Sequence, residues 1–231
     1  MLSVNDLHSF YDGSHTLHGV SFDLEEGGVL AVLGRNGVGK TTLLKSIMGL
    51  AVRSTGSIEL ASHELINEPT YLRARAGIGY VPQGRQIIPD FTVRENIILG
   101  GFADEQNTKF MPEIAETLFP YIVENLDRRG ALLSGGQQQQ LAIVRALATD
   151  PRLLLLDEPT EGIQPNIVEK IEEAIITLNE SLGISVILVD QNIEFARRAA
   201  KSFLLMEKGR IVAGGPIDDL TDDLVHQYMA I

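Results

Sequence analysis

The sequence predicts an α/β fold with a largely parallel sheet, and three observations support this prediction. Short apolar runs that are typical of buried strands alternate with stretches whose apolar residues recur every three or four positions, as they do in helices. A glycine-rich segment joins one of these strands to a helix, and an acidic pair follows another strand. With 231 residues, of which 44% are hydrophobic, the chain is long enough to bury the core of one such domain.

The N-terminal part is expected to hold strands and the first helix. Val20, Phe22 and Leu24 alternate with polar residues, which is typical of a half-buried strand, and an antiparallel part is expected at the N-terminal edge of the sheet. Residues 29–33 form a short apolar run that predicts a buried strand. A helix is expected from the glycine-rich segment to Met48, followed by strands at residues 57–60 and 78–81.

The remaining elements follow the same alternation. Residues 103–148 are expected to be mainly helical, with interruptions at Pro112 and Pro120. Pro165 is placed to begin another helix, because apolar residues follow it at spacings of three and four. Buried strands are expected at residues 153–156, 185–189 and 203–206, with a turn at Lys208-Gly209 before a last strand at 211–213.

Composition excludes several classes of protein. The formal net charge is −12 and no cluster of Lys and Arg occurs, so nucleic-acid binding is not expected. The chain has no cysteine, which excludes disulfides and thiolate metal sites. No apolar run approaches the roughly 20 residues that span a bilayer, and the N-terminus lacks the basic and apolar regions of a secretory signal. We therefore expect a cytoplasmic protein.

The glycine-rich segment predicts a nucleotide site. It has the spacing of a P-loop, whose backbone N–H groups turn inward around phosphate oxygens, and it lies between a predicted strand and a predicted helix. In a P-loop the lysine reaches the outer phosphates and the following hydroxyl residue can bind Mg²⁺. The residues expected to contact the nucleotide here are Gly34, Arg35, Asn36, Gly37, Val38, Gly39, Lys40, Thr41 and Thr42.

Asp157 and Glu158 directly follow the predicted strand at residues 153–156. The carboxyl end of a parallel strand lies at the edge of the sheet where the P-loop also lies. Asp157 is therefore expected to hold Mg²⁺ together with Thr41, and Glu158 to accept a proton from the attacking water. An acidic pair with no catalytic role, at a helix entry, is the alternative.

A second glycine loop, residues 134–137, precedes another predicted helix. The helix N-terminus behind it favours anions, so Ser134, Gly135, Gly136 and Gln137 are expected to contact phosphate. If residues 135–148 are helical, about 14 residues at about 1.5 Å each separate the loop from the strand at residues 153–156 by roughly 20 Å. The second glycine loop would then act on the nucleotide of a second copy. A simple N-cap serine is the alternative.

Together these motifs make the chain resemble the ATP-binding subunits of ATP-binding cassette (ABC) transporters over essentially its whole length. The P-loop, Gln83, Leu-Ser-Gly-Gly-Gln and Leu-Leu-Leu-Leu-Asp-Glu occur in the order and spacing of that family. The resemblance implies a P-loop NTPase core with an antiparallel N-terminal β-subdomain and an inserted helical subdomain. The implied bounds are approximately residues 1–85 and 150–231 for the core and 86–149 for the helical subdomain, which ends in the second glycine loop, all in one domain over 1–231.

The resemblance also implies roles for individual residues. Tyr11 matches the aromatic residue that stacks on adenine, with a strand-packing tyrosine as the alternative. Gln83 matches the residue that senses Mg²⁺ and the γ-phosphate, and the segment after it would line the groove for the membrane subunit. Two positions depart from the family's pattern: Gln191 replaces the switch histidine and Gln164 replaces an aspartate. Gln191 is nevertheless expected to contribute to catalysis.

These departures resemble the ATPases of importers for branched-chain amino acids, amides and urea, and the stretches at residues 34–40, 137–143 and 160–165 most resemble the ATPases of urea importers. The resemblance implies a subunit that hydrolyses ATP to drive uptake of urea or short amides, with branched-chain amino acid import as the alternative. Its implied partners are a second ATPase subunit, two integral membrane permeases and, indirectly, a solute-binding protein, on the inner face of the plasma membrane. A soluble ABC-type ATPase of DNA repair, ribosome function or cofactor assembly remains a further alternative.

Overall fold

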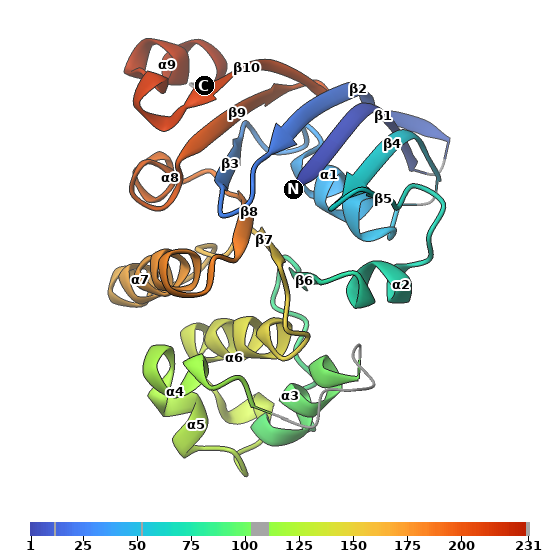
Figure 1. The fold of residues 1–231 in the computed structure, drawn as a ribbon. Helices are drawn as coiled ribbons and strands as arrows, with labels where there is room; N and C mark the ends of the chain where they lie inside the picture. Colours follow the sequence, from blue (N-terminus) through green and yellow to red (C-terminus); the bar gives the residue numbers. More distant parts are fainter. Residues whose placement is uncertain (12, 52, 103–110, 230–231) are drawn as a thin grey trace.

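The computed structural model describes residues 1–11, 13–51, 53–102 and 111–229, and Figure 1 shows how its elements are arranged. A six-stranded sheet has the order β10-β9-β3-β8-β7-β6 and is parallel except for β10. Its strands agree with the predicted ones and have the bounds Val29–Leu33 (β3), Ile78–Val81 (β6), Leu153–Asp157 (β7), Ser185–Val189 (β8), Ser202–Glu207 (β9) and Arg210–Pro216 (β10).

The central strands of this sheet are covered on both faces. Every residue of β3, β7 and β8 is buried, as expected of parallel strands between two layers of helices. Successive side chains point to opposite faces, so Leu154 and Val186 pack into one hydrophobic cluster while Leu155 and Ile187 pack into another. The continuous apolar runs of the sequence are the direct consequence of this two-sided burial.

The antiparallel strands form a sheet of their own. Strands β1 (Leu2–Tyr11), β2 (Ser14–Leu24), β4 (Arg53–Leu60) and β5 (His63–Glu64) pair in the order β2-β1-β4-β5. Only parts of β2 and β4 were predicted from their patterns. The antiparallel N-terminal β-subdomain that the resemblance implies is therefore present, whereas the expectation of an antiparallel part at the edge of the parallel sheet itself is wrong. Helix α1 (Lys40–Met48) contributes Leu43, Leu44 and Ile47 to a hydrophobic cluster that contains residues of both sheets. The two sheets therefore share one core, to which α1 belongs.

The helical part lies beyond the β6 end of the parallel sheet (Figure 1). It contains α3 (Val93–Gly101), α4 (Ile114–Leu118), α5 (Pro120–Glu124), a single turn at Gly130–Leu132 and α6 (Gly135–Leu147). Most of the predicted helical region is thus helical, Pro120 occupies the first turn of α5 as expected, and residues 103–110 lie outside the described residues. The proposed subdomain bounds at residues 86 and 149 stay a prediction.

The remaining helices are α2 (Thr70–Arg75), α7 (Pro165–Leu182), α8 (Ile193–Ala199) and α9 (Asp222–Met229), with a short turn at Ile217–Asp219. Helix α7 begins at Pro165, as predicted, because proline needs no N–H partner in the first turn of a helix. Its apolar face, including Ile171, Ile175 and Leu178, packs into the same cluster as Leu154. Helices α7 and α8 thereby cover the face of the sheet opposite α1.

Candidate active site

The P-loop, residues 34–41, connects β3 to α1 in a conformation that requires glycine. Gly34 has φ 151° and a Cβ there would lie 2.5 Å from the Met206 carbonyl oxygen, while Gly39 has φ 109° and a Cβ there would lie 2.9 Å from Leu17. A residue with a side chain at either position would clash with its neighbours. The predicted order of strand, glycine loop and helix is therefore present.

Lys40 is the lysine of this loop, and its side chain is turned back toward the loop backbone. Its Nζ donates hydrogen bonds to the carbonyl oxygens of Gly34, at 2.8 Å, and Arg35, at 3.0 Å. Burial lowers the pKa of Lys40, and the charges of Glu158, Asp157 and then Asp190 oppose this shift. An anion bound in the loop would add a further negative charge beside the ammonium group and favour its charged form.

Asp157, the last residue of β7, and Thr41, in the first turn of α1, are joined by a hydrogen bond. The Thr41 hydroxyl donates a hydrogen bond to Asp157 Oδ1 at 2.9 Å, and the Tyr80 hydroxyl donates one to Asp157 Oδ2 at 3.2 Å. Asp157 is only 1% exposed, and burial raises its pKa despite these hydrogen bonds. The two oxygen ligands that Thr41 and Asp157 offer suit a small hard cation such as Mg²⁺, which prefers one or two protein oxygens and completes its shell with phosphate and water.

The rest of the chain is consistent with this kind of metal site. Among the described residues, no group of three or more His, Cys, Asp and Glu side chains could hold a metal ion. Water and the phosphates of a nucleotide would complete the coordination of a metal bound at Thr41 and Asp157.

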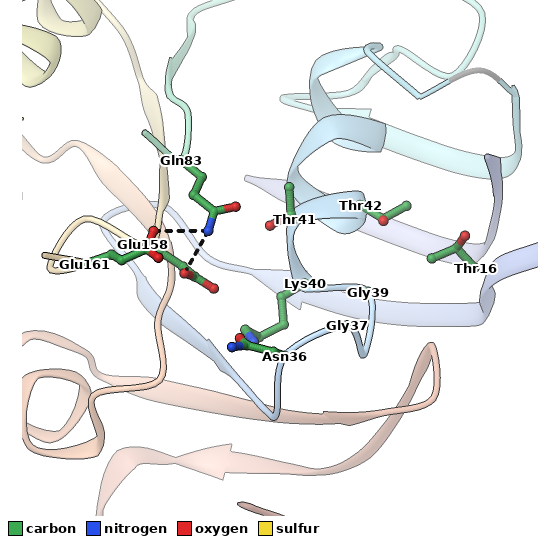
Figure 2. A pocket seen from close by; sticks show the side chains of 10 residues that line it. All are labelled: Thr16, Asn36, Gly37, Gly39, Lys40, Thr41, Thr42, Gln83, Glu158 and Glu161. Carbon is green, nitrogen blue, oxygen red and sulfur yellow. Dashed lines mark hydrogen bonds between the residues drawn. The ribbon is translucent and has the colours of Figure 1, made fainter. Parts of the chain in front are cut away.

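Gln83 links two acidic residues at the mouth of the site. Its Nε2 donates to Glu158 Oε2 and to Glu161 Oε2, both at 3.1 Å, as Figure 2 shows. Burial is the main factor that raises the pKa of Glu158, with Lys40 opposing it and Glu161 adding to it. Glu158 also has φ 48°, a left-handed conformation that its N–H stabilises by donating to the Val189 carbonyl oxygen at 2.8 Å. A carboxylate with a raised pKa is a stronger proton acceptor than an ordinary glutamate.

A cavity of about 290 Å³ joins these groups. Figure 2 shows the P-loop on one side and Gln83, Glu158 and Glu161 on the other. Its lining consists of Thr16, Asn36, Gly37, Gly39, Lys40, Thr41, Thr42, Gln83, Glu158 and Glu161. The arrangement places a lysine, three hydroxyl groups and a potential proton acceptor around one space.

Gln191 lies on the other side of the P-loop. It lines a second cavity, of about 570 Å³, together with Gly34, Arg35 and Asn36 and with residues of α8 and α9. The turn that carries Gln191 is held by Asp190, whose Oδ1 accepts hydrogen bonds from the backbone N–H groups of Gln191 and Asn192 at 2.7 and 2.9 Å. Asn36 lines both cavities, so the two cavities lie on either side of this P-loop residue.

Some predicted residues are not brought together within the described part of the chain. Residues 134–137 do not line the first cavity; Ser134 and Gln137 instead cap helix α6 reciprocally. Tyr11 does not line it either, and its ring lies 5.8 Å from Lys45 Nζ. Val38 contributes its carbonyl oxygen to a hydrogen bond from Gly209 at 2.9 Å. Their expected contacts with a nucleotide stay predictions.

Sequence reasoning missed four residues that shape the site: Thr16, Tyr80, Glu161 and Asp190. The Asp190 Oδ2 atom accepts a hydrogen bond from the Thr160 hydroxyl at 2.8 Å and so joins the segment after β7 to the segment after β8. Its position at the end of a buried apolar run was a usable signal, the same one that identified Asp157. Tyr80 gave no such signal because it belongs to a regularly paired strand, and Thr16 gave none because it lies at a register shift between β1 and β2 that no local pattern marks.

A model of the family described as ABC transporter matches residues 17–161, which is more than half of the chain. The chain belongs to the ABC transporter family. It is an ABC-type ATPase, and ATP is its nucleotide. No helix in the described ranges is long and apolar enough to cross a membrane.

Curated relatives of this ABC ATPase are similar to it over almost their entire length. The high-affinity branched-chain amino acid transport ATP-binding protein BraG of Pseudomonas aeruginosa is 38% identical over 213 residues, which cover 92% of this chain and 91% of the relative. A probable branched-chain amino acid transport ATP-binding protein, LivF of Archaeoglobus fulgidus, is 34% identical over 223 residues, with 96% and 94% covered. The lipopolysaccharide export ATP-binding protein LptB of Escherichia coli is 32% identical over 231 residues, with 97% and 94% covered.

Solved structures agree with the fold of this ABC ATPase. A dimeric ATP-binding cassette bound to ADP and inorganic phosphate in a post-hydrolysis state superposes with a TM-score of 0.80 at 26% identity, over 94% of this chain and 99% of that one. An ATP-binding cassette of an ABC transporter in its ADP conformation gives a TM-score of 0.80 at 25% identity, with 98% and 97% covered. The P-loop NTPase core predicted from the sequence is thereby confirmed.

Proposed function

We propose that this ABC ATPase is the subunit of a membrane importer that hydrolyses ATP to energise uptake of a small polar solute. The observation that carries the proposal is the first cavity, in which Lys40, the Thr41–Asp157 pair and Glu158 surround one space. Lys40 would exchange the carbonyl oxygens of Gly34 and Arg35 for the β- and γ-phosphates of ATP. Mg²⁺, held by Thr41, Asp157 and Gln83, would neutralise charge that develops on the phosphates.

The hydrolytic step follows from the position of Glu158. Its carboxylate accepts a proton from a water molecule as the water oxygen bonds to the γ-phosphorus, and the bond from that phosphorus to the bridging oxygen breaks to give ADP and phosphate. Gln83 holds the Glu158 carboxylate by donating to Oε2 at 3.1 Å. Gln191 would donate to the γ-phosphate from the other side of the P-loop, since its amide can donate and accept but does not titrate.

The position of the second glycine loop leads us to propose that the ATPase acts as a dimer. Ser134 begins α6, away from the first cavity of its own chain, so its hydroxyl would be available to the γ-phosphate of a second ATPase subunit. The family relative with bound ADP and phosphate is itself dimeric, which supports this arrangement. ATP would then lie between two subunits, whether these are identical or different.

For the solute, we propose urea or a short amide. The sequence features that favour it are Gln191 at the switch position and the segment Thr160-Glu161-Gly162-Ile163-Gln164-Pro165. Import of branched-chain amino acids is the second candidate, because BraG and LivF carry that activity in their names. In either case two permease subunits would bind beside Phe91, which is 38% exposed after the Gln83 segment, and a solute-binding protein would act through them.

Fractionation of cells that express the tagged chain tests the transport role. The chain should sediment with membranes and release from them with its permeases in detergent, on the cytoplasmic side. If the chain is found wholly in the soluble fraction of cells that also express its permease subunits, the result would favour a soluble non-transport ATPase instead. Purified complex, supplied in turn with urea, a short amide or leucine and the matching binding protein, then identifies the solute: the correct solute stimulates ATP hydrolysis and the others do not.

A further inference from the structure

Two residues that follow Gln83 have backbone conformations that side-chain-bearing residues rarely adopt. The angle φ is 67° at Arg85 and 45° at Gln86, and both values lie in the left-handed region. Such conformations persist only where the surrounding structure holds them in place. The contacts of these two residues therefore identify what fixes the end of the Gln83 loop.

Arg145 of helix α6 makes those contacts. Its Nη1 atom donates to the Gln86 carbonyl oxygen at 2.7 Å, and its Nη2 atom donates to the Arg85 carbonyl oxygen at 2.9 Å. A guanidinium group presents its donors in a planar fork, so it can hold two neighbouring carbonyls in one geometry, whereas a lysine ammonium group cannot. Burial lowers the pKa of Arg145, as expected of a cation taken out of water to reach these oxygens.

Backbone hydrogen bonds within the loop connect these carbonyls to Gln83. The Arg85 N–H donates to the Pro82 carbonyl oxygen at 3.0 Å, and the Gln86 N–H donates to the Gly84 carbonyl oxygen at 2.7 Å. The first bond closes a turn around Gln83, whose amide reaches Glu158, and the second fixes the backbone at Arg85 directly after that turn. A displacement of the two carbonyls would displace the Gln83 amide with them.

The Arg85 side chain adds a second connection to the same helix. A Cβ on Gly135, the first residue of α6, would lie 3.1 Å from Arg85 Nη1, so the guanidinium group passes directly over the start of the helix. Arg85 Nη2 also donates to the Glu161 carbonyl oxygen at 3.4 Å. Helix α6, which begins at the second glycine loop, thus contacts the Gln83 loop at both ends.

We propose that Arg145 is a positioning residue for ATP hydrolysis, which fastens the Arg85 and Gln86 carbonyls to helix α6 and thereby sets the Gln83 amide against Glu158. The same helix that presents Ser134 to a second subunit would then determine whether Gln83 is in place. This inference rests on the proposed function, because it assumes that Gln83 and Glu158 act on ATP.

A purely structural role for Arg145 is the alternative, and Arg73 provides the matched control. Arg73 is a buried arginine, 3% exposed, whereas Arg145 is half-buried; like Arg145, it donates to backbone carbonyl oxygens and to no carboxylate in the described contacts. Its acceptors belong to Ser46, Ile47, Ile66 and Glu68, away from the Gln83 loop. Arg73→Lys should lower thermal stability at least as much as Arg145→Lys does, since Arg73 is the more buried of the two and donates to four backbone carbonyls.

The kinetic test compares these variants in the full chain at saturating Mg-ATP. Arg145→Lys should lower kcat about 10-fold and change KM for ATP less than about 2-fold, because the transition state loses a positioned group while nucleotide binding keeps its contacts. In a Gln83→Ala background the same substitution should lower kcat less than about 2-fold further, since its effect acts through Gln83. Arg73→Lys should leave kcat within about 2-fold of the wild type.

Amide hydrogen exchange supplies a readout that needs no catalysis. In the nucleotide-free chain, Arg145→Lys should speed exchange of the Arg85 and Gln86 N–H groups about 10-fold or more, whereas Arg73→Lys should not. Unchanged exchange there, or a loss of kcat that multiplies fully with that of Gln83→Ala, would overturn the inference. If Gln83→Ala itself kept wild-type turnover, the assigned role of Gln83 would be wrong, and exchange would still decide whether Arg145 holds the loop.

Discussion

At the residue scale, burial acts on the charged groups of the site in opposite directions. It lowers the pKa of Lys40 and raises those of Asp157 and Glu158, because burial disfavours the charged form of each group. Mutual attraction between Lys40 and Glu158 opposes both shifts. A polyphosphate would add negative charge beside Lys40 and a divalent cation would add positive charge beside Asp157, and each would favour the charged form of its neighbour.

Lys40→Ala should abolish productive ATP binding. The substitution removes the cation that we expect to contact the β- and γ-phosphates, and the small side chain leaves the P-loop backbone able to fold. Binding of a fluorescent ATP analogue and steady-state turnover should both fall to background, while the circular dichroism spectrum stays that of the wild type. Near wild-type turnover in this variant would show that the P-loop assignment is wrong.

Gln191→Ala should lower turnover by roughly 10- to 10³-fold, the scale of losing one transition-state hydrogen-bond donor, with little change in ATP affinity. Gln191→His should keep part of the activity and add a dependence on pH near 6 to 7, where an ordinary histidine titrates. Both variants are measured as kcat against pH in the assembled transporter. Since Gln191 lines the second cavity rather than the first, unaltered turnover in Gln191→Ala would assign it to the Asp190 turn alone.

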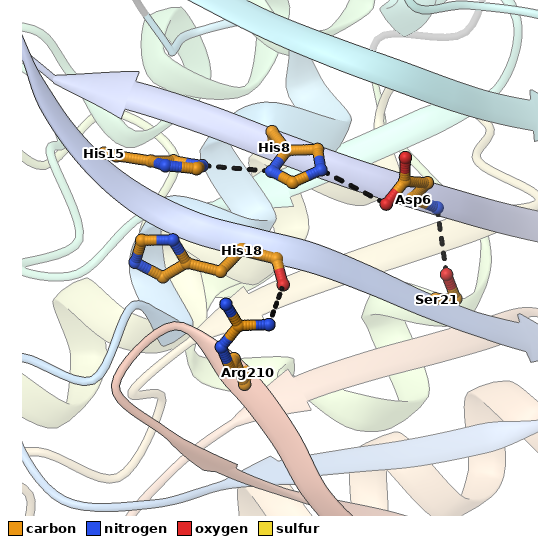
Figure 3. Close-up of polar contacts among 6 residues, drawn as sticks. All are labelled: Asp6, His8, His15, His18, Ser21 and Arg210. Atoms are coloured by element: carbon orange, nitrogen blue, oxygen red, sulfur yellow. Dashed lines mark hydrogen bonds and ion pairs between the residues drawn. The ribbon is translucent and has the colours of Figure 1, made fainter.

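At the element scale, the β1–β2 hairpin carries three histidines on one face. His8 Nδ1 and His15 Nε2 are 3.0 Å apart, His8 Nε2 is 3.1 Å from Asp6 Oδ1, and the His15 and His18 rings have centroids 4.0 Å apart (Figure 3). The Arg210 guanidinium of β10 donates to the His18 carbonyl oxygen at 3.1 Å. The pKa of His18 is lowered, first by burial and then by the charges of His15, Arg210 and His8.

This lowered pKa predicts a loss of stability in acid. In the folded chain His18 binds a proton less readily than in the unfolded chain, so the unfolded state takes up protons first as the pH falls below about 6.5. The stabilisation is fully present above that pH and is lost as the pH falls toward the folded-state pKa. We expect the urea midpoint of the wild type to drop more between about pH 7.5 and 5.5 than that of His18→Gln.

Parallel pH dependence in the wild type and in His18→Gln would refute the prediction. His63→Gln, on β5 and outside the hairpin cluster, is the matched control and should follow the wild type.

The elements also show where sequence patterns were sufficient. The strand at Val29–Leu33, the helix from Lys40 and the helix from Pro165 were all predicted close to their observed bounds, because each combines a local apolar period with a glycine or proline at its end. Strand β1 was not predicted from its pattern. Its pairing partners are β2 and β4, and register shifts next to Val4 and Leu7 interrupt its alternation.

At the scale of the whole molecule, the site is divided between two faces of the chain. The first cavity contains Lys40 and Glu158, whereas the second glycine loop begins α6 in the helical part. A single chain therefore does not bring its own Ser134 to its own cavity among the described residues. The proposed dimer brings the two together, so trapping that dimer tests the division.

Glu158→Gln keeps the shape of the side chain and removes its basicity. Hydrolysis should fall by about 10²-fold or more while ATP still binds, so an ATP-bound dimer should accumulate in size-exclusion chromatography. Adding Ser134→Glu should return the protein to the monomer, because the new carboxylate would repel the γ-phosphate across the interface. Ser181→Glu, at an exposed position near the C-terminal end of α7, is the control and should leave the dimer intact. A stable ATP dimer in the Ser134→Glu variant would contradict the role of the second glycine loop.

The sequence alone determined the fold class, the P-loop, the acidic pair after β7 and the resemblance of the chain to ABC ATPases. These features can be read from the sequence because glycine spacing and apolar periods are local properties. The tertiary structure decided which side chains meet. Thr41 and Asp157 are 116 positions apart, Gln83 and Glu158 are 75 apart, and Arg145 reaches carbonyls about 60 positions before it. Strand order and side-chain direction set these contacts, and both depend on the packing of the whole core, which no local pattern encodes.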